Sequence, residues 1–238
     1  MTRRFVGIVL ALAVGLLALG GLNAQAGNVP LPATLAALEG NSTIQGNLEF
    51  SFSNTAYTVT PAGSPPPASA VFVNPFSITG ETGITFNGAF SANVNQTVDY
   101  AITYTVTTTD GSKISDAYLG IGGFVNNGGT GSVSIGETIL NSSGTVISKV
   151  PFEVFTSPPP GLSLSSDTTV LTPPDTTITV QKDITVFGGS NGAAFSFTNQ
   201  GFSTTTTAIP EPASMALLGI GLSGLFTLRR LFRRTSVA

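Results

Sequence analysis

The chain has 238 residues, with 9 Lys and Arg against 12 Asp and Glu, and it contains neither histidine nor cysteine. These absences remove the commonest general base, the serine triad, most zinc sites, thiol nucleophiles and disulfides. Between residues 27 and 209 there are three lysines and eleven acidic residues, a net charge of −8. Nucleic-acid binding needs clustered basic residues, so it is not expected. The composition predicts a protein that is not an enzyme and that needs no cofactor or metal.

The N-terminus has the pattern of a secretory signal peptide. Arg3 and Arg4 precede an apolar run over residues 5–22, and Ala24 and Ala26 are small residues two positions apart. This combination predicts export and cleavage by signal peptidase after Ala26, so that residues 1–26 are removed. An uncleaved membrane helix is the alternative, since the apolar run is just long enough to span a bilayer.

Residues 27–202 are predicted to form a single all-β domain, an antiparallel β-sandwich of Ig-like or jelly-roll-like type. Apolar and polar residues alternate around residues 48–53, 97–106 and 178–186, which is typical of strands with one buried face. Further strand-like runs cover residues 70–73, 83–90, 115–124, 131–140, 145–155 and 193–197. Only residues 33–38, ended by Gly40, suggest a helical turn.

Turn and proline signals separate these runs. Hairpin turns are predicted at Asn87-Gly88, Asp110-Gly111, Asn127-Gly128-Gly129, Ser143-Gly144 and Asn191-Gly192. The prolines at 61, 65–67, 158–160 and 173–174 belong in loops or edge crossings, because proline cannot donate to a central ladder.

Two pairs of residues in this domain are candidate ligand sites. Tyr100 and Tyr104 share one strand face at a spacing that suits sugar rings, but Ile102 between them marks that face as core. The opposite face, with Thr103, Thr105, Thr107, Thr108 and Thr109, is expected to be exposed. Asp110 with Asp116 is a weak Ca²⁺ candidate that lacks EF-hand spacing, and a turn-forming Asp110 with an exposed Asp116 is the simpler interpretation.

The C-terminal region combines three features in a fixed order. After a Thr-rich linker at residues 203–209, Pro210, Glu211 and Pro212 lead into a mostly apolar run over residues 213–228. Arg229, Arg230, Arg233 and Arg234 follow it as a basic stop-transfer cluster. Sixteen helical residues span about 24 Å, less than the roughly 30 Å hydrocarbon core, but flanking arginines can snorkel and the bilayer can thin. The positive-inside rule places the arginines in the cytoplasm and the body outside.

This tripeptide, apolar helix and arginine cluster resemble the PEP-CTERM sorting signal of Gram-negative bacteria, over residues 210–238. Ile209 stands where valine is usual. The resemblance implies that an exosortase, a membrane-embedded transpeptidase-like enzyme, cuts near residues 210–212, in a bacterium that makes exopolysaccharide. The chain is therefore expected to cross the inner membrane, to be anchored there transiently, and to reach the cell surface or extracellular matrix as a structural protein. A carbohydrate-binding or adhesive module is the alternative.

Overall fold

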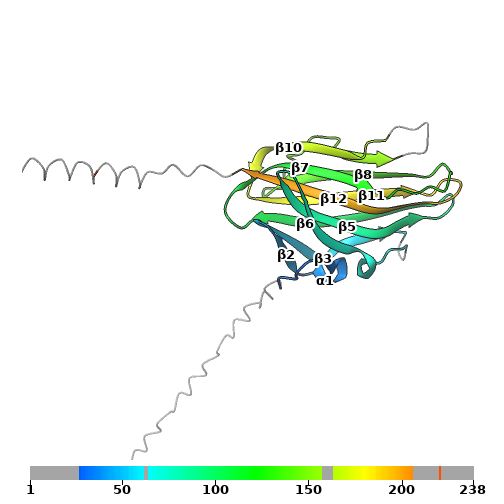
Figure 1. The fold of residues 1–238 in the computed structure, drawn as a ribbon, viewed down its shortest axis with the longest axis horizontal. Helices are drawn as coiled ribbons and strands as arrows, with labels where there is room; N and C mark the ends of the chain where they lie inside the picture. The colour runs from blue at the N-terminus through cyan, green and yellow to red at the C-terminus, as the bar shows by residue number, and fades with distance from the viewer. Residues whose placement is uncertain (1–26, 62–63, 157–162, 206–219, 221–238) are drawn as a thin grey trace, which may run out of the picture.

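The computed structural model describes residues 27–61, 64–156, 163–205 and 220. Within these ranges the chain forms two antiparallel six-stranded sheets that pack face to face (Figure 1). Sheet 1 runs in the spatial order β1 (Ala33–Thr34), β4 (Phe72–Ile78), β5 (Glu81–Ala92), β12 (Ala193–Thr205), β7 (Lys113–Gly122) and β10 (Ser166–Asp175). Sheet 2 runs in the order β2 (Ser42–Gln45), β3 (Leu48–Thr60), β6 (Thr97–Thr108), β11 (Thr177–Phe187), β8 (Ser132–Asn141) and β9 (Glu153–Thr156). The predicted all-β sandwich is confirmed.

Consecutive strands often lie in opposite sheets. From β5 to β8 every connection crosses between the sheets, and so do the connections from β10 to β11 and from β11 to β12. Strand β12 lies between β5 and β7 in sheet 1, although both of these strands come much earlier in the chain. Two short helical segments, α1 (Leu35–Leu38) and the 3-10 turn η1 (Ala68–Ala70), lie beside the strands, and α1 confirms the predicted helical turn.

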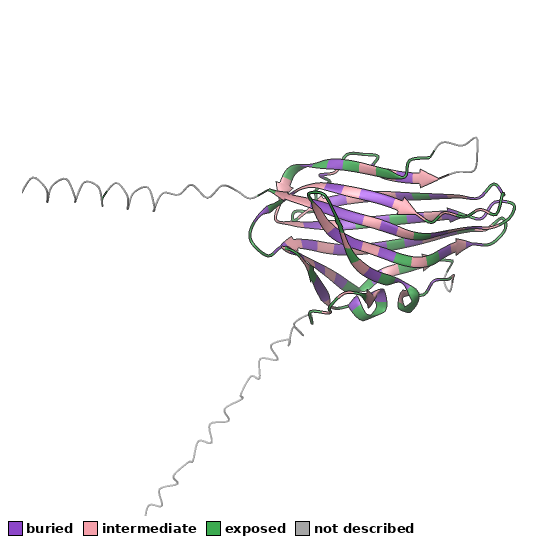
Figure 2. Cartoon of the chain, in the orientation of Figure 1, coloured by how far each residue is buried: buried purple, intermediate pink, exposed green. Residues whose placement is uncertain are grey.

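The core lies between the two sheets and follows the period-two pattern. Buried and exposed residues alternate along the strands in Figure 2, most regularly in β6 and β11. Tyr100 and Tyr104 are almost completely buried, which confirms their assignment to the core. The Tyr100 hydroxyl lies 2.6 Å from the carbonyl oxygen of Pro65 and so ties a proline-rich loop to the sandwich.

Two local predictions on this sandwich were wrong. The Asn87-Gly88 pair is not a turn, because β5 continues through it and the register with β12 shifts between Phe195 and Phe197. The glycine marks a β-bulge, the other common use of glycine inside a strand. Thr108 is buried rather than exposed, and its hydroxyl donates to the Ser112 carbonyl.

Two segment boundaries also differ from expectation. Of the strand-like residues 145–155, only the last three belong to a strand, β9. Strand β12 continues to Thr205 and so includes the first three residues of the predicted linker 203–209. Pro173 and Pro174 lie in β10, an edge strand, where a missing N–H is tolerated.

Both predicted membrane-directed segments lie outside the described residues. These are the signal peptide at residues 1–26, with Ala24 and Ala26, and the sorting tail at residues 210–238 apart from Ile220. In the part of the chain that the structure describes, no helix combines the length and the apolar character needed to cross a membrane.

Strands β5 and β12 approach each other closely at Gly83. A Cβ at Gly83 would collide with the backbone carbonyl oxygen of Gln200, whereas a Cβ at Gly136 in β8 would meet no described atom within 4 Å. Gly83→Ala is expected to lower the free energy of unfolding by about 1–3 kcal/mol. Gly136→Ala should leave it unchanged or raise it by up to about 1 kcal/mol. Urea unfolding measures both, and equal losses would contradict the close approach at Gly83.

Candidate ligand-binding face

The outer face of sheet 1 carries several aromatic side chains. Residues of sheet 1 that alternate with the buried Val73, Ile84 and Leu119 point away from the core. On this outer face lie Phe72 and Phe76 of β4, Tyr118 of β7 and Phe197 of β12. Phe72 is 51% exposed and the other three are partly buried.

Two glycines lie between Phe76 and Tyr118 in sheet 1. Phe76 is paired with Gly83, Gly83 with Gly201, and Gly201 with Tyr118, in one row across four strands. A Cβ at Gly201 would meet Glu81 Oε2 and the Phe76 ring, and a Cβ at Gly120 would meet the Tyr118 ring, so these glycines leave room for the side chains above them. The rings of Phe76 and Tyr118 stack, with centroids 5.8 Å apart and planes 13° from parallel. Phe76 and Tyr118 therefore form one pair of stacked rings on the outer face of the sheet.

A polar row lies beside the aromatic pair. Thr85 of β5 is paired with Asn74 of β4 and with Asn199 of β12, and its hydroxyl donates to Asn199 Oδ1 at 2.7 Å. This bond holds the Asn199 side chain by its oxygen on the outer face of sheet 1 and leaves the NH₂ group as its hydrogen-bond donor. Aromatic faces with fixed amides beside them can contact both the C–H face and the hydroxyl groups of a neutral polar ligand.

Two carboxylates lie at the end of the same face. Glu81 Oε2 is buried and has no hydrogen-bond partner among the described residues, and Asp116 Oδ1 accepts from the Ser203 N–H at 3.2 Å. Burial, and then the nearby charge of Asp116, raise the pKa of Glu81. Sequence spacing did not reveal this pair, because 34 positions separate the two residues and only the β5–β12–β7 order brings them together.

Asp110 and Asp116, the Ca²⁺ candidate of the sequence analysis, have different partners in the structure. Asp110 accepts from the Ser112 N–H and from the Asn47 side chain, both at 3.0 Å, and hydrogen bonds from these two residues lower its pKa. Asp110 therefore shapes the turn between β6 and β7, while Asp116 interacts with Glu81. Within the described ranges, no group of three or more acidic, His or Cys side chains could hold a metal ion.

A groove of about 470 Å³ lies on the outer face of sheet 2. Its floor comes from β6, β8 and β11, including Thr103, Gly136 and Asp183, and the segment 150–153 forms one wall. Val150 on this wall is 82% exposed, but the Phe152 ring is buried and does not present an aromatic face to the groove. The groove therefore lacks the aromatic surface that sheet 1 has.

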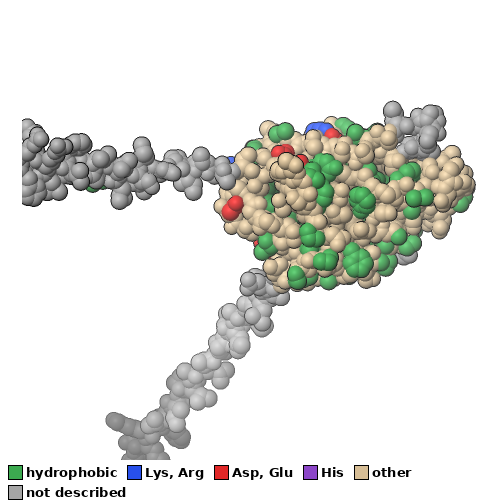
Figure 3. Space-filling model, in the orientation of Figure 1, with side chains coloured by type: hydrophobic (Ala, Val, Ile, Leu, Met, Phe, Trp, Pro, Cys, Tyr) green, Lys and Arg blue, Asp and Glu red, His purple; other side chains and the backbone are tan. Residues whose placement is uncertain are grey.

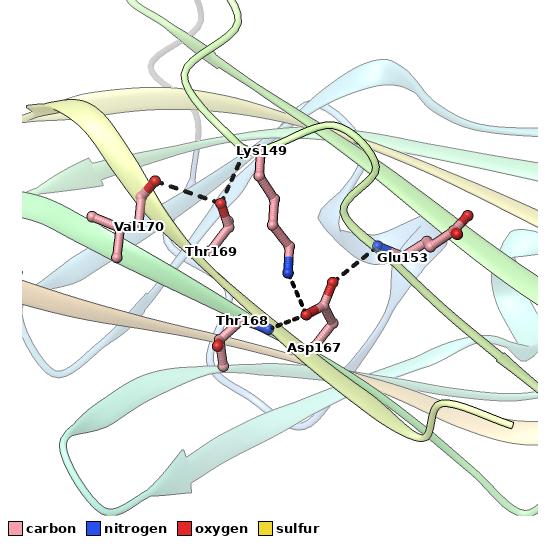
Figure 4. Close-up of polar contacts among 6 residues, drawn as sticks. All are labelled: Lys149, Glu153, Asp167, Thr168, Thr169 and Val170. Carbon is pink, nitrogen blue, oxygen red and sulfur yellow. Dashed lines mark hydrogen bonds and ion pairs between the residues drawn. The ribbon is translucent and has the colours of Figure 1, made fainter.

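The wall of this groove is tied to sheet 1 by Asp167 of β10 (Figure 4). Asp167 Oδ1 accepts from Lys149 Nζ and from the Thr168 N–H, and Oδ2 accepts from the Glu153 N–H. The Lys149 N–H in turn donates to the Thr169 hydroxyl at 2.9 Å. These bonds connect the two sheets along one side of the sandwich.

Asp167 is expected to matter more to stability than its lysine partner. Asp167→Ala removes the acceptor of two backbone N–H groups and should cost about 1–3 kcal/mol of unfolding free energy. Lys149→Ala removes a side chain that is 46% exposed, and such ion pairs contribute about 0–1 kcal/mol. Thermal or urea unfolding compares the two variants, and an equal loss would show that the ion pair dominates.

A further polar cluster lies inside the core. Lys182 of β11 lies directly opposite Glu137 of β8, and Lys182 Nζ donates to Glu137 Oε2 at 2.6 Å and to Oε1 of Gln200 in β12 at 2.9 Å. The side chains of Lys182 and Glu137 are both 0% exposed. This cluster, named the Lys182 cluster below, joins sheet 2 to sheet 1 through the middle of the sandwich.

Sequence reasoning identified neither the aromatic face of sheet 1, nor the groove on sheet 2, nor the Lys182 cluster. Its tyrosine candidates Tyr100 and Tyr104 are core residues, and its site residues Pro210, Glu211 and Pro212 and the four arginines lie outside the described ranges. A usable signal existed in β4, where apolar residues occupy both alternating sets, as Phe72 and Val73 show. A strand with apolar residues on both faces predicts either a covered outer face or a binding surface.

Comparison with known proteins identifies the C-terminal tail. Residues 208–234 match the family model for the PEP-CTERM protein-sorting motif. This confirms the resemblance found in the sequence, is consistent with an exosortase substrate, and implies export, membrane-anchored sorting and a final place at the cell surface. No curated protein matches the chain.

Among solved structures, the body is similar to several β-rich chains at low identity. Tailspike protein 4 of Bacteriophage CBA120 gives a TM-score of 0.27 at 15% identity over 63% of this chain, which covers 20% of the tailspike chain. TmCBM61, solved with β-1,4-galactotriose, gives 0.28 at 11% identity over 61% of this chain and 88% of its own. The isomalto-dextranase of Arthrobacter globiformis T6 gives 0.25 at 14% identity, over 61% of this chain and 23% of its own. Likenesses this distant support no functional inference.

Proposed function

We propose that this chain is a structural protein of the cell surface or extracellular matrix, processed at its C-terminal tail by an exosortase-type enzyme and associated with exopolysaccharide. The observation that carries the proposal is the sorting motif at residues 208–234. In it, Pro210, Glu211 and Pro212 precede an apolar run and a cluster of arginines. The apolar run would hold the chain in the inner membrane and the arginines would stop transfer, so that the enzyme meets the tripeptide at the outer surface of that membrane.

The body supports a role in binding rather than catalysis. The face shown in Figure 3 consists largely of uncharged polar surface with dispersed hydrophobic side chains and few charged ones. A face with few charged side chains suits contact with hydrated polymers. The negative net charge of the body as a whole favours solubility after export. We propose no catalytic role towards a separate substrate, in keeping with the lack of histidine and cysteine, the commonest general base and the thiol nucleophile.

Processing is tested by changing the tripeptide. Replacing Pro210, Glu211 and Pro212 together by alanine in the native host should abolish cleavage, since the apolar run is kept and only the recognition sequence is lost. Mass spectrometry of the C-terminal peptide reads the outcome, and replacing Thr205, Thr206 and Thr207 by serine is the matched control. Identical C-terminal peptides from the unchanged chain and the alanine variant would contradict processing at this motif.

Carbohydrate binding is the second candidate, and the stacked rings of Phe76 and Tyr118 beside Asn199 favour it. A sugar ring laid on these faces would bury its C–H groups, and the amides would meet its hydroxyls.

The aromatic face is tested by truncating its rings one at a time. In the mature secreted protein, Phe76→Ala and Tyr118→Ala should each weaken binding to the purified exopolysaccharide of the host about threefold to tenfold, since each removes roughly 0.5–1.5 kcal/mol of ring contact. Phe187→Ala is the control, because Phe187 is 39% exposed on the outer face of sheet 2. Binding that survives both substitutions, or that falls equally with the control, would contradict this role of the face.

A further inference from the structure

The Lys182 cluster places an amine, a carboxyl group and a carboxamide in contact at the centre of the core. Lys182 Nζ lies 2.6 Å from Glu137 Oε2 and 2.9 Å from Gln200 Oε1. The amide carbon of Gln200 is one carbonyl bond, about 1.2 Å, from that oxygen, so the amine lies beside an electrophilic carbon. Lys182 and Gln200 come from opposite sheets, on β11 and β12.

The surroundings of the three side chains are apolar. Lys182 is paired with Ile102 on one side and with Glu137 on the other, and Gln200 lies between Ile84 and Leu119. Burial lowers the pKa of Lys182 and raises the pKa of Glu137, with their mutual attraction acting against both shifts. Both shifts run towards a neutral amine and a neutral carboxylic acid, and the neutral amine is the nucleophilic form of lysine.

A hydrogen-bonded ion pair does not satisfy all the atoms of the cluster. Glu137 Oε1 and Gln200 Nε2 are buried without a hydrogen-bond partner among the described residues, and so is the neighbouring Tyr104 hydroxyl. Each unpaired buried polar group destabilises the folded protein. Removing the Gln200 NH₂ group would remove one of these groups.

We propose that Lys182 and Gln200 become joined by an intramolecular isopeptide bond, with Glu137 as the catalytic residue that transfers the protons. This inference does not depend on the proposed function of the body.

The reaction balances without a further reactant. The lone pair of Lys182 Nζ attacks Cδ of Gln200. Glu137, as the neutral acid, gives its proton to Nε2, the Cδ–Nε2 bond breaks, and ammonia leaves. The carboxylate of Glu137 then takes the surplus proton from Nζ. The products are a secondary amide between Nζ and Cδ and one molecule of ammonia, and Glu137 ends in its starting protonation state.

The bond would staple the two sheets through the core. It would close a loop of 17 residues between Lys182 and Gln200 and would add a covalent link between β11 and β12. A chain without cysteine cannot make a disulfide, and an amide link is insensitive to reducing agents. Such a link would hold the sandwich closed in an extracellular setting whatever the redox conditions.

The full chain, digested with trypsin and analysed by mass spectrometry, tests the proposal directly. The expected product is a peptide that runs through an uncut Lys182, contains Gln200, and is lighter than encoded by one ammonia, about 17 Da. Fragment ions should place the link between these two residues. Cleavage after Lys182 together with the encoded mass would overturn the proposal and leave the cluster as a plain buried ion pair.

Two variants separate the link from other losses of ammonia. Lys182→Arg keeps the positive charge but lacks the amine, and Glu137→Gln keeps the shape but lacks the acid, so both should show the encoded mass. A loss of about 17 Da that persists in Lys182→Arg would overturn the proposal, because cyclisation at Asn191-Gly192 in the same peptide gives the same mass change. If Lys182→Arg does not fold, Gln200→Met takes its place with the same expected mass. A link that forms at full yield in Glu137→Gln would exclude Glu137 from the proton transfer.

Discussion

The structure of the body depends on the closure of two apolar sheet faces against each other. Neither sheet is stable alone with one face of Val, Ile, Leu and Phe in water, and the connections between β5 and β8 force the chain to build both sheets together. Strand β12 completes sheet 1 by pairing with both β5 and β7. Its glycine at 201 faces Gly83 and leaves room for Glu81 and the Phe76 ring on the outer face. The candidate binding face is thus a consequence of how the core closes.

The same closure explains why a lysine lies among core residues. Lys182 occupies an inward position of β11, where the alternation Val180, Lys182, Ile184 leaves it no path to solvent. Its amine is acceptable in the core only because Glu137 occupies the facing position on β8 and Gln200 reaches it from the other sheet. Three chemically matched groups at one point of an otherwise apolar layer indicate a specific role for this point of the core.

The sequence predicted the fold class and most strands, because alternation with period two is a local property that burial of one face imposes. It could not predict strand order, since the pairing of β12 with β5 and β7 depends on contacts between residues 75 to 120 positions apart. For the same reason it missed the pairs Phe76 with Tyr118 and Glu81 with Asp116. Asn87-Gly88 misled because the same dipeptide serves in hairpin turns and in bulges, and only the neighbouring strand decides between them.

Strand β12, the last described strand, lies inside sheet 1 rather than at its edge, and it pairs with β5 as far as Phe202 and with β7 as far as Thr205. Any mechanical pull on the tail is therefore applied along β12, parallel to the strand, and the ladders to β5 and β7 share the load in shear. Many hydrogen bonds must then break together before the strand can slide, whereas an edge strand would peel away one bond at a time. The position of β12 makes the sandwich resistant to tension applied at the C-terminal end of this strand.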